Sequence, residues 1–234
     1  MPDLRAAESH PCRYPVPPPA CLGSCRMPSG FASVRHAGVR IDAAAAGPGV
    51  SLRPSAVAWL RETLDAWRVP FVLLATCNRS ELYWVASGAG PADEVVAGAF
   101  GEALHRSGVA VPFTRRDGED AVRHLLRVAC GLDSLVVGEV EILGQVRAAL
   151  QEAPDHDLLG GVFRAAIRAG RMARAETALG AGAISVASSA IHALASRTPL
   201  AGARGVIVGA GGAARAAARQ IGNGGVAAVG GAHP

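Results

Sequence analysis

The residue with the clearest chemical potential is a cysteine that follows an apolar run. Residues 69–75 are short and hydrophobic, which predicts a buried strand, and the polar residues 76–80 after them contain Cys77. A cysteine nucleophile needs access and a nearby cation that lowers the pKa of its thiol, and Arg79 lies two residues further on. The alternative is a small side chain that fills a gap, the role we expect for Cys130. Local sequence leaves both interpretations open.

A glycine-rich segment near the C-terminal end has the pattern of a phosphate-binding turn. Residues 206–208 predict a strand, followed by Gly-x-Gly-x-x-Ala at residues 209–214 and then a helix. The first two glycines, Gly209 and Gly211, would let the backbone turn tightly and approach a pyrophosphate at the helix N-terminus. An ordinary turn between a strand and a helix explains the pattern almost as well.

The elements that must position these residues follow from hydrophobic periodicity. Apolar residues at helical spacing predict helices near 54–67, 93–107, 120–130, 141–153 and 185–197, and one extended helix at 158–178 that links two domains. Strands are expected near 31–41, 69–75 and 81–86, the last two as antiparallel or continuing partners. The polar residues 76–80 therefore form a loop at a strand end, where a rigid scaffold commonly holds reacting groups.

Composition restricts the class of protein more than its activity. The net charge of +4 and the pI near 9.1 permit a polyanionic partner without requiring one. Five cysteines, an odd number, and no apolar signal segment predict a cytoplasmic protein with reduced thiols. Cys21 and Cys25 have no second ligand pair, so we expect no metal site. No apolar run approaches the roughly 20 residues of a membrane helix, so we expect no membrane span.

Two sequence blocks resemble those of a known enzyme family. Residues 76–83 contain every fixed position of Thr-Cys-Asn-Arg-x-Glu-x-Tyr, and residues 124–139 are similar to His-Leu-x-x-Val-Ala-x-Gly-Leu-Asp-Ser-x-Val-x-Gly-Glu. An Ile-Leu-Gly-Gln continuation follows at residues 142–145. Both blocks resemble the glutamyl-tRNA reductases, and agreement at this density and spacing is not expected by chance.

The resemblance implies roles for individual side chains. Cys77 would be the catalytic nucleophile, with His124 near its thiol to accept or share a proton near neutral pH. Standing alone, His124 would be read as a surface histidine on a helix. Arg79 offers a planar fork for a substrate carboxylate. The residues implied to line the glutamyl pocket are Thr76, Asn78, Arg79, Ser134, Glu139 and Gln145.

The sequence departs from the family pattern at three places. Val140 and Glu141 stand where the family usually has Pro-Gln, which removes a rigid turn and adds a charge; both are still expected near the substrate. His36 corresponds only loosely to a histidine of the family's first strand. After residue 222 the Asn-Arg expected on the second cofactor strand is missing, and so is the helical region that makes the family homodimeric.

The resemblance also implies a cofactor and a domain plan. NADPH would bind at the glycine-rich segment, through Gly209, Ala210, Gly211, Gly212, Ala213 and Ala214. We expect an α/β protein: a disordered leader at 1–30, an α+β catalytic domain at 31–157, a linking helix at 158–180 and an incomplete Rossmann-type domain at 181–234.

The reaction implied is the NADPH-dependent reduction of glutamyl-tRNA(Glu) to glutamate-1-semialdehyde through a cysteine thioester, in tetrapyrrole biosynthesis. Glutamate-1-semialdehyde aminomutase is the protein partner implied for the product. The short glycine-rich region leaves three alternatives: an active reductase completed by another chain or segment, a fragment that forms the thioester and loses glutamate to water as an esterase, and an inactive fragment that only binds glutamyl-tRNA.

Overall fold

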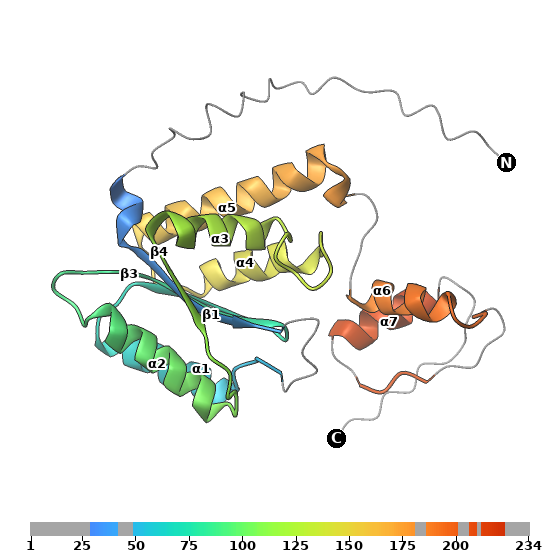
Figure 1. Cartoon of the computed structure of the whole chain (residues 1–234), viewed down its shortest axis with the longest axis horizontal. Helices are drawn as coiled ribbons and strands as arrows, with labels where there is room; N and C mark the ends of the chain where they lie inside the picture. The colour runs from blue at the N-terminus through green and yellow to red at the C-terminus, as the bar shows by residue number, and fades with distance from the viewer. Residues whose placement is uncertain (1–28, 42–48, 181–185, 201–205, 210–211, 223–234) are drawn as a thin grey trace.

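The structure, a computed structural model, describes residues 29–41, 49–180, 186–200, 206–209 and 212–222 (Figure 1). The expected leader falls almost entirely outside these residues. A short 3-10 helix, η2 (Ser29–Ser33), leads into the first strand.

One antiparallel sheet organises the domain. Its strands are β1 (Val34–Arg40), β2 (Phe71–Ala75), β3 (Arg79–Val85) and β4 (Thr114–Asp117), in the order β2-β3-β1-β4. The three expected strands are confirmed, and β2 and β3 are antiparallel partners. We did not predict β4: its sequence TRRD is mostly exposed and lacks apolar alternation, and only its pairing with β1 makes it a strand.

Five helices cover the two faces of the sheet. They are α1 (Pro54–Ala66), α2 (Asp93–Arg106), α3 (Gly118–Ala129), α4 (Glu141–Gln151) and α5 (Asp157–Glu176). All five were expected to within a few residues at each end. In Figure 1, α1 and α2 lie on one side of the strands and α3, α4 and α5 on the other.

Each face of the sheet contributes to its own hydrophobic core. Along β2, Phe71 and Leu73 enter the core beneath α1 and α2, whereas Val72 and Leu74 enter the core beneath α3, α4 and α5. This is the two-residue period of a strand, with successive side chains on opposite faces. Because both faces are covered, the strand appears in the sequence as a continuous apolar run.

The expected linking helix is also a wall of the domain core. Phe163 and Ala166 of α5 are fully buried against the neighbouring helices. A Cβ placed on Gly170 would lie 2.5 Å from the carbonyl oxygen of Ala129, so the glycine lets α5 approach the end of α3 closely. The 3-10 helix η3 (Ala178–Gly180) follows.

The C-terminal segment contains two helices, α6 (Val186–Ala195) and α7 (Gly212–Gly222), which pack against each other. The strand expected at residues 206–208 is not formed. Val206 and Val208 are 84% and 82% exposed, and no neighbouring strand supplies hydrogen bonds to residues 206–209 within the described part of the chain. Nowhere in the described residues is a helix both long and apolar enough to cross a membrane.

Candidate active site

The loop between β2 and β3 presents Cys77 to solvent. The backbone N–H groups of Asn78 and Arg79 donate to the hydroxyl of Thr76, at 3.2 and 3.1 Å, and the N–H of Thr76 donates to the carbonyl of Arg79 at 2.8 Å. A threonine that accepts from the residues ahead of it closes a tight turn. Cys77 is the residue at the tip of this turn, and its side chain is exposed.

The electrostatic surroundings of the thiol differ from those that the sequence suggested. Partial burial raises the pKa of Cys77, and the nearby carboxylate of Glu139 raises it further. A backbone hydrogen bond opposes this rise, and the carboxylate of Glu141 adds a smaller increase. The expectation that Arg79 lowers this pKa is wrong. The Arg79 guanidinium turns away from the loop and is engaged by other groups, so the thiol faces carboxylates instead of a cation.

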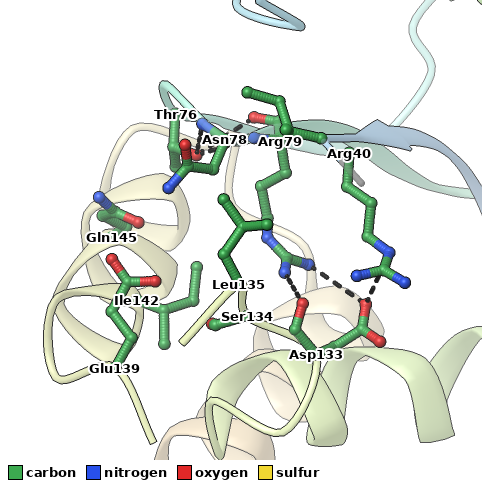
Figure 2. A pocket seen from close by; sticks show the side chains of 11 residues that line it. Arg40, Thr76, Asn78, Arg79, Asp133, Ser134, Leu135, Glu139, Ile142 and Gln145 are labelled. Carbon is green, nitrogen blue, oxygen red and sulfur yellow. Dashed lines mark hydrogen bonds and ion pairs between the residues drawn. The ribbon is translucent and has the colours of Figure 1, made fainter. Parts of the chain in front are cut away.

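A pocket opens beside this loop, between the sheet and the segment that precedes α4 (Figure 2). The structure brings six of the residues expected at the substrate together around this one pocket: Thr76, Asn78, Arg79, Ser134, Glu139 and Gln145. The other lining residues are Arg40, Ile41, Asp133, Leu135 and Ile142. Val140 and Glu141 are exposed and do not line the pocket, although Glu141 still affects the thiol through its charge.

Below the pocket lies a buried network of charged and polar groups that is centred on Glu81. One carboxylate oxygen of Glu81 accepts from Arg79 at 2.8 Å and lies 3.0 Å from Nε2 of His124, and the other accepts from the hydroxyl of Tyr83 at 2.8 Å. Burial alone would raise the pKa of Glu81, but hydrogen bonding to His124 and the proximity of His36 hold it well below its usual value. Glu81 is therefore a carboxylate that binds its neighbours together.

His124 belongs to this network, and both of its ring nitrogens are directed at carboxylates. Its ring is 6% exposed on α3, with Nε2 directed at Glu81 and Nδ1 3.9 Å from a carboxylate oxygen of Asp133. Since an ionised Glu81 only accepts hydrogen bonds, Nε2 of His124 carries the proton. His124 is thus connected to the loop through other residues, because it holds Glu81, which holds Arg79. Its expected role at the Cys77 thiol stays a prediction.

His36, which the sequence related only loosely to the site, is part of the same network. It projects from β1 toward α3, with Nε2 3.8 Å from Glu81 and a ring centroid 4.6 Å from that of His124. Gly38 makes this approach possible, because a Cβ at Gly38 would lie 2.7 Å from Nε2 of His36 and 2.9 Å from Cγ of Glu81. Burial lowers the pKa of His36, although Glu81 partly opposes this.

By residue type, His36, Glu81 and His124 could hold a metal ion, since one ligand atom from each lies within 4.8 Å of the others. The second nitrogen of His36 weighs against it. A metal-bound histidine normally donates its other N–H to an acceptor, whereas Nδ1 of His36 faces the guanidinium of Arg116 at 3.5 Å. An arginine can only donate, so Nδ1 is the acceptor and Nε2 carries the proton of the neutral ring.

The loop between α3 and α4 carries Ser134 and Glu139 to the pocket, and Arg174 of α5 fastens it. The Arg174 guanidinium donates to the carbonyls of Ala129 and Glu139, at 2.9 and 2.8 Å. Gly131 begins the loop at a φ of 76°, a conformation that favours glycine. The loop that brings Glu139 to the pocket is therefore fixed at both ends.

Comparison with known proteins decides the family. The family described as glutamyl-tRNAGlu reductase, N-terminal domain, matches residues 50–177, which is more than half of the chain. The chain belongs to the glutamyl-tRNA reductase family. A glutamyl-tRNA reductase of Thermus thermophilus is 46% identical over 145 residues, and one of Stenotrophomonas maltophilia is 40% identical over 176 residues.

These matches cover 60% and 73% of this chain but only 35% and 39% of the relatives, so the chain spans well under half of their length. A solved structure of the glutamyl-tRNA reductase from Methanopyrus kandleri is similar with a TM-score of 0.57 and 32% identity, over 85% of this chain and 48% of that one. The resemblance read from the two sequence blocks is thereby confirmed, as is the α/β fold class. The domain boundaries stay a prediction.

Several pocket residues of this reductase-family chain had no role assigned from the sequence. Asp133 and Ile142 fall within the matching blocks, but only the structure shows that they line the pocket. Arg40 ends β1, where no motif marks it, and its Nε lies 3.8 Å from a carboxylate oxygen of Asp133. No sequence signal identified Arg40, because its place depends on the register of β1 against β3.

The residues expected to bind a dinucleotide are only partly described. Gly209 has a φ of 116°, which favours glycine, and α7 begins at Gly212 and includes Ala213 and Ala214. Ala210 and Gly211 lie outside the described residues. A dinucleotide site of this kind needs a strand that enters the turn. Since residues 206–209 do not form one, the described residues provide the helix of such a site without its strand.

Proposed function

We propose that this chain acts on glutamyl-tRNA(Glu) as a glutamyl-tRNA reductase, forming a thioester at Cys77 on the way to glutamate-1-semialdehyde in tetrapyrrole biosynthesis. The observation that carries the proposal is the position of Cys77: an exposed thiol at a strand end, between two residues that line a polar pocket. The pocket offers hydrogen-bond donors and acceptors of the kinds that a glutamyl group can use, from Asn78, Ser134 and Gln145.

In the step that we derive, the Cys77 thiolate attacks the carbonyl carbon of the glutamyl ester. A sulfur–carbon bond forms, the ester carbon–oxygen bond breaks, and the terminal oxygen of the tRNA leaves as a hydroxyl after it takes a proton from solvent. This proton balances the one that the thiol gave to solvent when it became a thiolate. Thr76 shapes the turn that holds the thiol outward, and Arg79 is fixed by Glu81 and by the carbonyl of Asp133. Two of the Arg79 donors are occupied in this way, so Arg79 shapes the pocket wall whether or not it also meets the substrate carboxylate.

We propose NADPH as the reductant of this family reaction; when bound, it would supply a hydride to the thioester. Residues 206–209 and 212–222 do not by themselves fit a dinucleotide, because the entering strand is missing there. We therefore derive no step through NADPH in this chain. The aminomutase partner, the homodimer and the cytoplasmic location likewise stay predictions.

The exposure of Cys77 supports a second candidate activity. Water that reaches the thiol can also reach a thioester formed on it, and would release free glutamate. The chain would then act as an esterase on glutamyl-tRNA. The two activities share the thioester and differ only in what consumes it.

The test uses glutamyl-tRNA labelled in the amino acid, with and without NADPH. The wild-type chain is expected to carry label, Cys77→Ser to carry none, and Cys130→Ser, the matched control on a half-buried thiol, to carry as much as the wild type. Semialdehyde that depends on NADPH identifies the reductase, and free glutamate identifies the esterase. Absence of label from the folded wild-type chain would contradict both.

A further inference from the structure

The carboxylate of Glu139 is the one charge lining the pocket for which the described residues supply no ion-pair partner. Glu139 is 7% exposed. The other charged lining residues are paired: Arg79 with Glu81 at 2.8 Å, and Arg40 with Asp133 at 3.8 Å. In Figure 2, Glu139 and Gln145 project from the α4 side, apart from the group formed by Arg79, Asp133 and Arg40. Burying a carboxylate without a cation is unfavourable, so this side of the pocket suits a positively charged ligand group.

Hydrogen bonding in the pocket is incomplete on the same loop. The Ser134 hydroxyl is buried near the Glu139 carboxylate, but it makes no hydrogen bond of good geometry among the described residues. Buried polar groups are nearly always hydrogen-bonded, and exceptions in a pocket mark a place for a ligand. Ser134 and Glu139 therefore point to a ligand group that both donates hydrogen bonds and carries positive charge.

The substrate that we propose carries such a group beside the bond that breaks. In an aminoacyl ester the α-ammonium nitrogen and the carbonyl carbon are both bonded to Cα, which keeps them about 2.5 Å apart. If Sγ of Cys77 attacks that carbon, the cation must lie within a few ångströms of the sulfur. A single ammonium group can then contact Glu139 and influence Cys77 at once.

We propose that Glu139 binds the α-ammonium group of the aminoacyl ester, and that this cation converts Cys77 into a thiolate when the substrate is in place. The inference rests on the proposed function. It makes Glu139 a specificity-determining residue for esters whose amino group is free, and it makes the nucleophile depend on the substrate for its activation.

The charges around the thiol explain why activation requires the ligand. Glu139 precedes α4 and Glu141 begins it, and both carboxylates raise the pKa of Cys77 in addition to the effect of burial. Arg79 follows Cys77 by two residues but is bound to Glu81, and Arg40 faces Asp133 across the pocket. Neutralising Glu139 with an ammonium ion removes a repulsion and adds an attraction. An opposite charge at this range raises the thiolate fraction about tenfold or more.

The first experiment measures the reaction of Cys77 with iodoacetamide as a function of pH in the empty chain, with Cys77→Ser as the blank. Glu139→Gln and Glu141→Gln are each expected to react several-fold faster than the wild type at pH 7, because each removes one negative charge from the neighbourhood of the thiol. Circular dichroism checks that both variants are folded. Unchanged reactivity in Glu139→Gln would overturn the inference.

The second experiment compares thioester formation from glutamyl-tRNA and from N-acetylglutamyl-tRNA, whose amino group is neutral. The wild type is expected to react about tenfold or more faster with the free amino group. Glu141→Gln is expected to keep this preference, because Glu141 does not line the pocket, and Glu139→Gln to lose it. Equal rates for the two esters in the wild type, or an undiminished preference in Glu139→Gln, would overturn the inference while leaving the proposed function intact. Absence of thioester from either ester would overturn both.

Discussion

Within the described part of the chain, charged side chains are paired on one side of the candidate pocket and unpaired on the other. On the β3 side, Arg79 and Glu81 are buried and bonded at 2.8 Å, and Glu81 also binds Tyr83 and His124. On the α4 side, Glu139 is buried without an ion-pair partner among the described residues. A network in which opposite charges are paired holds a shape, whereas an unpaired charge is available to a ligand. We infer that the first side is the scaffold of the site and the second is where substrate charge is recognised.

Breaking the charge pair on the β3 side should have the largest effect on stability. Glu81→Gln removes the closer carboxylate from the buried Arg79 guanidinium and leaves it only that of Asp133, 3.7 Å away. Removing one partner of a buried pair costs about 3–5 kcal/mol. The free energy of unfolding, measured by urea denaturation, should fall by that amount. A loss below about 1 kcal/mol would show that the network is not a scaffold.

Removing the Arg174 guanidinium, which holds the loop between α3 and α4, should have the next largest effect on stability. Arg174→Met removes the donors to the carbonyls of Ala129 and Glu139 and should destabilise the chain by about 1–3 kcal/mol, the usual range for buried acceptors left unsatisfied. Arg171→Met, an exposed neighbour on α5, is the control and should change stability by less than about 0.5 kcal/mol. Equal effects of the two changes would remove Arg174 from the scaffold.

Stability should depend on pH in opposite directions for Glu139, on the unpaired side, and for Glu81, on the paired side. Burial, and then Glu141, raise the pKa of Glu139 against smaller effects of Ser134 and Arg79, so the native carboxyl keeps its proton at a pH where the unfolded one, with a pKa of about 4.3, has lost it. Stability from this group falls as pH rises from that value through the folded pKa. Glu139→Gln should therefore become more stable relative to the wild type as pH rises, by about 1 kcal/mol or less.

The pKa of Glu81 is depressed in the folded chain. Its contribution to the free energy of unfolding is therefore fully present above the unfolded pKa and is lost as pH falls through the folded pKa. Urea denaturation from about pH 7 down to about pH 2 distinguishes the two sides, because the effect of Glu139 falls above the unfolded pKa of about 4.3 and that of Glu81 falls below it. Slopes of the same sign for Glu81→Gln and Glu139→Gln, each relative to the wild type, would contradict the comparison.

The smallest effect on stability is expected at a surface ion pair with the same separation as the Arg79–Glu81 pair. Arg106 and Glu102 are also 2.8 Å apart, but their side chains are 47% and 45% exposed. Glu102→Gln should lower the free energy of unfolding by less than about 0.5 kcal/mol. A loss comparable to that of Glu81→Gln would mean that burial does not separate the two pairs.

Two short apolar runs show how far the sequence could predict the fold. Residues 69–75 and 206–208 both predict a strand, yet only the first run forms one, the strand β2 at 71–75. The first run pairs with β3 and has both of its faces covered by helices. The second has no strand beside it in the described residues, and its valines are exposed. A short apolar run has a tendency to form a strand, but the strand forms only where a neighbouring strand pairs with it.

The candidate site was predictable where chemistry is local in the chain. Two sequence blocks identified the family, and six of the residues expected at the substrate lie together around one pocket. The orientations of charged side chains were not predictable. Arg79 lies two residues from Cys77 in the sequence, but alternation along β3 places it on the same face as Glu81 and Tyr83, where Glu81 binds it.

The sequence by itself determined the family, the helices and most strands of the domain, and the residue types of the site, because these depend on local pattern and motif. Only the tertiary structure decided which charges are neutralised. The register of β1 against β3 sets Gly38 opposite Glu81, leaving room for His36, and the fold brings His124 of α3 to the same carboxylate. Charge pairing depends on distances between elements that are remote in sequence. For that reason only the structure shows that the pKa of Cys77 is raised, where the sequence suggested that Arg79 lowers it.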